Sequence, residues 1–284
     1  MPRRNKKFKN ITKEDWVPFY SACVARSVPR SEARTKAEAK AALDKEWAKL
    51  RKQGCWDESR VREWKDLKAE CQKLNKKIHV GRIFDICVEK NAELDKSDPR
   101  RKFKGRVVFE GCNVRDEYNN WALFQEMSSC PATMEAAKAA DAYGMFGDND
   151  VELADGESAY TQALLGGTPT WIRIPKDQWP KKWIDEGMVD PVCPMILALY
   201  GHPDAGGWWE QHCHKALLMG GWAPIKNGSW KSVYWHQRLK LMLVVYVDDF
   251  KMAGPKGNLA EGWKTITEIG RIKMEPPTGI GRYL

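Results

Sequence analysis

Two adjacent carboxylates, Asp248 and Asp249, directly follow the longest uninterrupted apolar run of the chain, residues 241–247. A strand this apolar is expected to be buried on both faces, so carboxylates at its end are costly to desolvate unless a cation compensates. Mg²⁺ prefers such hard oxygens and keeps waters and substrate phosphates as its other ligands. The two side chains can converge on one site only where the chain turns sharply between two strands. The alternative is a solvated hairpin turn, in which Asp is common.

A third carboxylate, Asp155, ends another short strand-like segment, residues 150–155. In two-metal phosphoryl transfer, carboxylates on neighbouring strands hold two cations about 3.5–4 Å apart, one beside the attacking hydroxyl and one beside the leaving oxygen. One Asp after an early strand and an Asp pair on a later hairpin satisfy that requirement. We therefore expect Asp155, Asp248 and Asp249 to lie together.

The elements that must position these carboxylates are predicted from hydrophobic periodicity. Strands are expected at residues 150–155 and 171–174, with a hairpin over residues 233–252. Helices are expected over residues 131–145 and around residues 210–219. Helices beside an antiparallel sheet predict an α+β fold.

The first half begins with a basic arm over residues 1–30, for which we expect no regular structure. Two amphipathic helices follow, because Leu43, Trp47 and Leu50 recur at helical spacing and a second apolar stripe begins at Val61. A DNA-reading helix-turn-helix is the alternative, although Trp and Leu stripes usually mark packing faces. Strands in a hairpin-like arrangement are expected at 78–88 and 103–110.

Charge is unevenly distributed along the chain. Residues 1–110 carry 30 Lys and Arg against 17 Asp and Glu, a net charge of +13, whereas the whole chain carries +9 and the remainder therefore −4. A polyanion such as nucleic acid would bind the first half by releasing counterions. Solvated helices rich in Lys and Arg are the alternative.

Five sequence blocks, in order, resemble the reverse transcriptases of copia-type retrotransposons, and the resemblance covers roughly residues 40–284. No single block is decisive, but their order makes them specific together. The blocks are E-W-A-K-L at 46–50 with G-C-W at 54–56, K-F-K-G-R-V-V-F-E-G at 102–111, D-G-E-S-A-Y-T-Q-A-L-L-G at 155–166, A-L-Y-G at 198–201, and Y-V-D-D at 246–249.

The resemblance implies roles for individual residues. Asp155 and Asp248 would ligate two catalytic Mg²⁺ ions, for which Mn²⁺ could substitute, with Asp249 a weaker or more distant ligand. Lys104 and Arg106 would grip the triphosphate of an incoming dNTP. Tyr160 would lie under the nucleotide sugar and leave no room for a 2′-hydroxyl. The alternatives are a charged strand edge for the two basic residues and ordinary core packing for Tyr160.

The implied fold is that of a right-hand polymerase, with fingers over residues 31–145 and a palm with a ferredoxin-like sheet over residues 146–284. The implied function is RNA-directed DNA synthesis, with an RNA template and a DNA primer as partners. Because the resemblance stops at residues 281–284, we expect a fragment without a thumb or ribonuclease H domain. A catalytically inactive, nucleic-acid-binding remnant is the alternative, and an unrelated Mg²⁺-dependent phosphotransferase is a third hypothesis.

One departure from the family lies at residues 202–207, where H-P-D-A-G-G replaces the usual L-K-Q-A-P-R. Asp204 thus stands where the family has a Gln expected to contact nucleotide or template, and an acidic side chain there would repel phosphate unless it were paired.

Other chemistries have little support in the sequence. His212, Cys213 and His214, with Cys193 and His202, could suggest zinc, but no C-x₂-C pair is present. No P-loop, G-x-S-x-G or dinucleotide fingerprint occurs. With mean hydropathy −0.60 and no long apolar run, we expect no membrane association, and without a signal peptide we expect an intracellular protein, cytoplasmic or nuclear.

Overall fold

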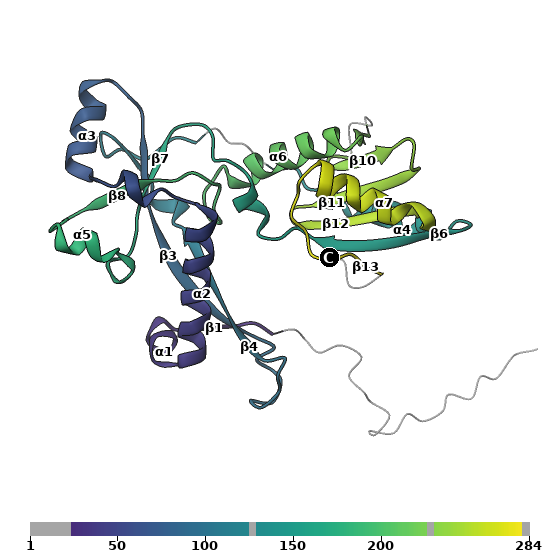
Figure 1. Cartoon of the computed structure of the whole chain (residues 1–284), viewed down its shortest axis with the longest axis horizontal. Coiled ribbons are helices and arrows are strands. Elements are labelled where there is room, and N and C mark those ends of the chain that lie inside the picture. Colours follow the sequence, from purple (N-terminus) through teal and green to yellow (C-terminus); the bar gives the residue numbers. More distant parts are fainter. Residues whose placement is uncertain (1–23, 125–128, 226–229, 280–284) are drawn as a thin grey trace, which may run out of the picture. The chain divides into compact units, whose positions relative to one another are not determined.

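The computed structural model describes residues 24–124, 129–225 and 230–279 (Figure 1). Residues 1–23 of the expected basic arm lie outside this part of the chain. The end of that arm is ordered, because Arg26–Val28 forms the first strand, β1. The chain divides into two compact units, one of Met1–Glu46 with Asp85–Arg106 and one of Trp47–Phe84 with Val107–Leu284. These boundaries differ from the expected division after residue 145.

Seven α-helices occur among the described residues. The two apolar stripes of the first half form α2 and α3. α2 ends one residue before Gly54, which has a φ of +70°. The side chain of Thr133 caps α4 by accepting a hydrogen bond from the Ala136 amide, so this helix begins later than Pro131. The helices are α1 (Arg30–Thr35), α2 (Ala37–Gln53), α3 (Trp64–Lys73), α4 (Met134–Gly144), α5 (Lys181–Asp185), α6 (Ala205–Met219) and α7 (Lys256–Lys264).

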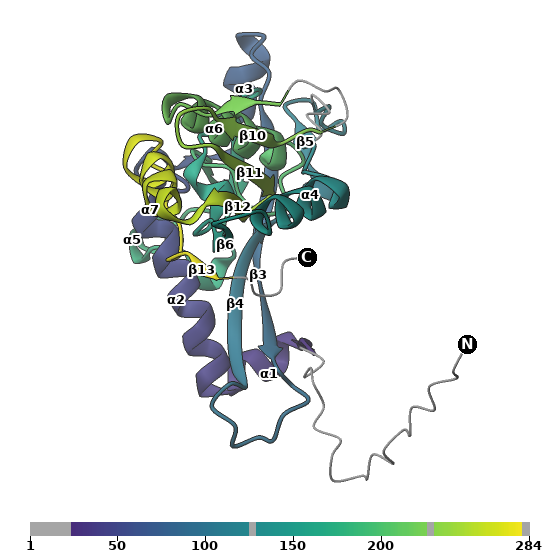
Figure 2. The same ribbon diagram turned by 90° about the vertical axis from the view of Figure 1, so that its right-hand side faces the viewer.

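The first unit contains β1, α1, the start of α2 and one end of each of two long strands, β3 (His79–Lys90) and β4 (Lys102–Phe109). These two strands pair with each other and are drawn side by side in Figure 2. β1 pairs antiparallel with β3. Gly105 allows α2 to lie directly on β4, because a Cβ there would be 2.6 Å from the carbonyl oxygen of Ala42. The strands β3 and β4 and the helices α2 and α3 were predicted from the sequence, whereas β1 and α1 were not. The core of this unit consists of Val28, Ala33, Ala39, Leu43 and Cys87.

The second unit includes the other end of the first sheet. The beginning of β3 pairs parallel with β7 (Thr170–Arg173), which pairs antiparallel with β8 (Pro191–Pro194). Short strands β2 (Arg62–Glu63) and β5 (Arg115–Asp116) complete it. Tryptophan side chains fill much of the associated core, among them Trp47, Trp56 and Trp183.

A second sheet lies wholly within the second unit, and its paired strands are all antiparallel, in the order β13-β6-β12-β11-β10-β9. β6 and the β10 to β12 region follow the sequence prediction. α7, the π-helical turn Thr265–Ile269 and β13 were not predicted. The strands are β6 (Asn149–Asp155), β9 (Ala223–Pro224), β10 (Val233–His236), β11 (Leu241–Tyr246), β12 (Asp249–Pro255) and β13 (Thr278–Gly279).

Helices cover both faces of this second sheet. Alternate residues of β11 and β12, such as Leu243 and Met252, pack against α6 and α7. The intervening residues, such as Val244 and Ala253, pack against the small side chains of α4. This alternation follows from the two-residue period of a strand and makes the fold a mixed α/β layered structure (Figure 1).

In the described ranges, the chain has no helix with the length and apolar character that a membrane crossing requires.

Candidate active site

Asp155 and Asp249 are directly opposite each other in the second sheet. Asp155 is the last residue of β6, Asp249 is the first residue of β12, and their Cα atoms are partners in the antiparallel register. Side chains of such partners point to the same face. Val151 on β6 and Ala253 on β12, which share this face by two-residue alternation, pack against α4. The two carboxylates are therefore on the face opposite α6 and α7.

The electrostatics of Asp249 reflect this crowding. Burial, the nearby charges of Asp248 and Asp155, and a hydrogen bond with Asp155 together raise the pKa of Asp249 to about 6. Like charges this close oppose each other's ionisation. The three acidic residues singled out in the sequence thus act on one another in the structure.

Asp248 lies in a two-residue turn between β11 and β12. The turn begins after Tyr246, which pairs with Asp249 across the hairpin. The Gly156 amide, immediately after Asp155, donates a hydrogen bond of 2.6 Å to the Asp248 carbonyl oxygen. The end of β6 and the turn are consequently joined by backbone as well as by the strand ladder.

Tyr160 lies close to this turn. It belongs to a short 3-10 helix, Ala159–Gln162. Its half-buried ring packs edge-on against Tyr200, with the ring centroids 4.6 Å apart. Burial raises the pKa of Tyr160, and the charges of Tyr200 and Asp248 act in the same direction.

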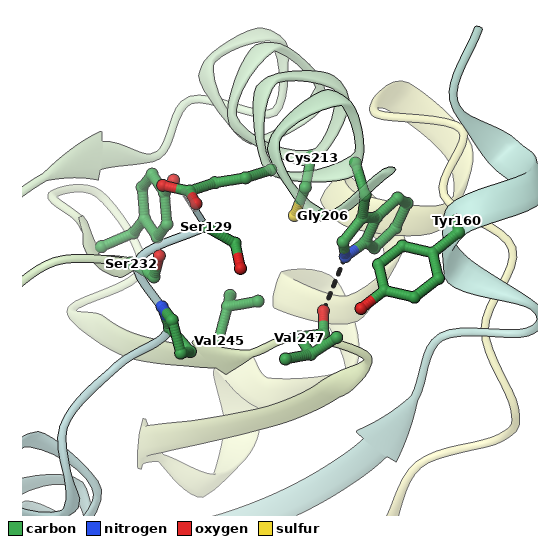
Figure 3. Close-up of a pocket in the computed structure, with 11 residues that line it drawn as sticks. Ser129, Tyr160, Gly206, Cys213, Ser232, Val245 and Val247 are labelled. Atoms are coloured by element: carbon green, nitrogen blue, oxygen red, sulfur yellow. Dashed lines mark hydrogen bonds between the residues drawn. The ribbon is translucent and has the colours of Figure 1, made fainter. Parts of the chain in front are cut away.

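A small pocket of about 20 Å³ opens between α6 and the turn, with Tyr160 and Val247 on one side and Ser129 and Ser232 on the other (Figure 3). Cys213 lines it from α6. Its wall is mostly apolar, and its volume is enough for little more than one water molecule.

Lys104 and Arg106 belong to the first unit, two residues apart on β4 and therefore on one face of it. Burial, together with the positive charges of Arg106 and Lys90, lowers the pKa of Lys104 to about 8. Lys104 is only partly exposed, so it is not a freely solvated edge residue. Three cations gathered in this way favour an anion.

Asp204 is buried, with 6% of its surface exposed, immediately before α6. The backbone amide of Asp204 donates a hydrogen bond to Nδ1 of the buried His202. Burial, together with the nearby His79, lowers the pKa of His202 to about 4. Nε2 of this neutral ring therefore carries the proton and faces Thr170 Oγ1 at 3.4 Å. Because Asp204 is buried, its carboxylate is not presented to phosphate, and the predicted repulsion does not apply.

The candidate zinc residues point to different partners. Cys213 is buried in the core, His214 Nδ1 lies 3.1 Å from the Tyr234 hydroxyl, and the His212 ring stacks on Trp209. Among the residues that the structure describes, no group of three or more His, Cys, Asp or Glu side chains forms a ready-made metal cage. The structure gives the zinc hypothesis no support.

Trp209 is a site residue that the sequence analysis did not single out. Its indole Nε1–H donates a 2.7 Å hydrogen bond to the Val247 carbonyl oxygen, shown as the dashed line in Figure 3. A tryptophan within a helix carries no sequence signal for a bond to a turn 38 residues away.

Comparisons with known proteins give no family for this chain. No family model matches, and a search of curated proteins finds no match. Among solved structures, a telomerase from Candida albicans in complex with a fragment of telomeric RNA has a TM-score of 0.35 and 9% sequence identity, covering 78% of this chain and 45% of the telomerase chain. The chain thus spans less than half of that protein, and a similarity this low establishes neither fold nor function.

Proposed function

We propose that this chain is the fingers and palm part of a copia-type reverse transcriptase, an RNA-directed DNA polymerase that transfers nucleotides from dNTPs to a primer 3′-hydroxyl. The observation that carries the proposal is the in-register pairing of Asp155 with Asp249, beside Asp248 on the connecting turn. Two sequence blocks more than 80 residues apart, each expected to be catalytic from the resemblance, have their carboxylates at one end of one sheet.

The topology of the second sheet supports a palm. The chain order β6, α6, β11, β12, α7, β13 and the strand order β13-β6-β12-β11 correspond to a split β-α-β-β-α-β, or ferredoxin-like, arrangement. α6 and α7 pack on one face. The carboxylates belong to the opposite face, at the end of the sheet, where Asp155 is exposed and Asp248 and Asp249 are partly exposed, so a substrate can reach them.

The residues present fit a divalent metal. Asp155, Asp248 and Asp249 offer hard oxygen donors, and the mutual repulsion that raises the pKa of Asp249 is what a bound cation would relieve. Mg²⁺ usually takes one or two carboxylates from a protein and completes its shell with waters and phosphates, so a complete protein cage is not required. When bound, two Mg²⁺ ions would neutralise charge on the attacking and leaving oxygens.

The chain's own residues would bind and orient the reactants. The primer 3′-hydroxyl would attack the α-phosphate in line, forming a new phosphodiester bond as pyrophosphate leaves. Lys104 and Arg106 would hold the triphosphate oxygens. Tyr160 would bound the space under the sugar, next to the turn that carries Asp248. Positioning of this kind supplies much of the rate in phosphoryl transfer.

A basic groove in the second unit supports a nucleic-acid partner. Arg60, Arg62 and Lys76 line it, and its apolar wall includes Trp171. The one acidic residue that lines it, Glu70, is paired with Arg62 at 2.7 Å. Phosphates could contact the cations of this groove while bases contact its apolar wall, as in other single-strand binding sites.

Primer extension tests the proposal. The chain is incubated with an oligo(dT) primer on poly(rA), dTTP and Mg²⁺, alongside Asp248→Asn as the matched variant. We expect incorporation that Asp248→Asn lowers by at least about 10³-fold, since a lost charge-stabilising group typically costs 10²–10³ or more. Thermal melts of both proteins confirm that each is folded.

The inactive-remnant hypothesis predicts a different outcome. In that case both proteins bind the template-primer with equal affinity and neither incorporates nucleotide. A Mg²⁺-dependent phosphotransferase would instead release phosphate from small esters without a template. Either result, with folded protein, overturns the polymerase proposal.

A further inference from the structure

The turn that carries Asp248 has an unfavourable backbone. Val247, its first residue, has a φ of +56°, whereas Asp248 does not have a positive φ. A two-residue hairpin turn with this pattern normally has Gly in the first position. Among the described non-glycine residues with positive φ, Val247 alone is β-branched, and such a residue at positive φ is a genuine outlier. Nothing in the local sequence favours this conformation.

Surrounding groups hold the turn on two sides. Trp209 Nε1–H donates to the Val247 carbonyl oxygen at 2.7 Å, and the Gly156 amide donates to the Asp248 carbonyl oxygen at 2.6 Å. Both carbonyls of the turn are thus fixed, one by α6 and one by the loop that follows Asp155. Trp209 is itself rigid, because it is 2% exposed within the core and its ring stacks on His212.

We propose that Trp209 is a positioning residue, whose indole N–H holds the strained Val247–Asp248 turn so that Asp248 and Asp249 face Asp155. This inference rests on the proposed polymerase function for its kinetic consequence, but the structural consequence is independent of it. Without the N–H, the turn is free to relax to a conformation that suits a β-branched residue. Relaxation would rotate the peptide units on which both carboxylates are mounted.

The neighbouring residue provides a matched control. Trp208 is also on α6, but its buried Nε1 has no hydrogen-bond partner in the described part of the chain. Replacing Trp208 by Phe therefore removes an unpaired N–H, whereas replacing Trp209 by Phe removes the bond to the turn. Both variants lose the same atoms from the same helix, so a difference between them reports the bond.

Primer extension with three variants tests the proposal. The variants are Trp209→Phe, Trp208→Phe and the double variant Trp209→Phe/Val247→Gly. We expect Trp209→Phe to lower kcat by about 10- to 100-fold, since small misplacements of reacting groups cost up to 10²-fold, with little change in KM for dTTP. Trp208→Phe should stay within about twofold of the parent. Gly adopts positive φ without strain, so Val247→Gly should restore most of the lost kcat in the double variant.

Hydrogen exchange provides a readout that does not depend on activity. The Gly156 amide and the amides of residues 247–249 should exchange faster in Trp209→Phe than in Trp208→Phe, with the rest of β11 and β12 unchanged. If Trp209→Phe does not fold, incorporation of 3-benzothienylalanine at position 209 removes only the N–H and keeps the ring shape.

The outcomes separate the two proposals. An active parent in which Trp209→Phe matches Trp208→Phe in both kcat and exchange overturns the positioning role and leaves the polymerase intact. Loss of kcat without faster exchange at the turn, or without rescue by Val247→Gly, also overturns it. An inactive parent with faster exchange only in Trp209→Phe overturns the polymerase and supports the role of Trp209 in holding the turn.

Discussion

The ammonium of Lys251 is buried beside the carboxylate of Asp141, with Nζ 2.8 Å from Oδ1 and 2.9 Å from Oδ2. Only 6% of the Lys251 side chain is exposed. Lys251 follows Asp249 by two residues on β12, so the two side chains share the face of the sheet on which α4 packs. The ion pair joins α4 to the strand that carries the candidate carboxylates.

Replacing Asp141 by Asn should destabilise the protein. The substitution keeps the side-chain shape but leaves the buried ammonium with a neutral partner, which costs more than removing an exposed charge. Because Asp141 is itself 45% exposed, we expect a loss of about 1–3 kcal/mol in the free energy of unfolding. Urea denaturation measures it.

Glu186→Gln provides the comparison for this variant. Glu186, the residue directly after α5, pairs with Lys182 one helical turn earlier, and both side chains are well exposed. Such a pair contributes less than about 0.5 kcal/mol. Equal stability losses in the two variants would contradict the special role of the buried pair.

The sequence predicted those parts of the site that depend on local pattern. The apolar run before Asp248, the segment ending in Asp155 and the amphipathic stripe of α2 all occur as strands or helices near the expected positions. An apolar stretch ended by charged residues has few ways to be buried, which is why these elements were predictable. The catalytic and metal-binding roles of Asp155, Asp248 and Asp249 stay predictions.

Features that depend on distant partners were not predictable. The bond between Trp209 and Val247 links a helix to a turn, and neither end has a distinctive local sequence. The burial of Asp204 was not predicted, because it depends on how the segment around His202 packs. The unit boundaries at residues 46, 84 and 106 cut through α2, β3 and β4, so no linker composition marks them.

Lys104 should give the protein a pH-dependent stability. Its pKa is about 8 in the folded protein and about 10.5 in an unfolded chain. Between these values the unfolded state holds a proton that the folded state has released, so the free energy of unfolding should rise with pH. Below pH 8 the folded state bears the cost of the buried charge. Urea denaturation from pH 7 to 10 should show this rise, and Lys104→Gln should abolish it.

The same lysine should make anion binding pH-dependent. If Lys104 and Arg106 hold a triphosphate, tripolyphosphate should raise Tm at pH 7, where Lys104 is charged, and lose much of this effect by pH 9.5. Lys104→Gln should weaken tripolyphosphate binding about tenfold at pH 7. Lys96→Gln, at an exposed position in the loop before β4, should not. Equal effects from both variants would argue against a specific site.

The groove between Arg60 and Lys76 should contribute to template binding. Each lost phosphate contact reduces the slope of log K against log salt by about 0.7 for a single strand, so Arg60→Gln/Lys76→Gln should reduce it by about 1.4. Fluorescence anisotropy with a labelled oligo(rA) at several salt concentrations measures the slope. Lys65→Gln is the control, since Lys65 is exposed on α3 and does not line the groove. An unchanged slope in the double variant would place the template elsewhere.

Tyr160 should control discrimination between dNTPs and rNTPs. Its ring lies near Asp248 and is braced by Tyr200, so it cannot readily move away from a 2′-hydroxyl. Tyr160→Ala opens that space, and we expect the ratio of kcat/KM for dTTP over UTP to fall by about 10- to 100-fold, the range that a steric contact of this size provides. Tyr160→Phe keeps the ring and should keep the ratio. If Tyr160 only fills the core, Tyr160→Ala should lower Tm and both kcat/KM values together and leave their ratio unchanged, because loss of packing affects both nucleotides equally.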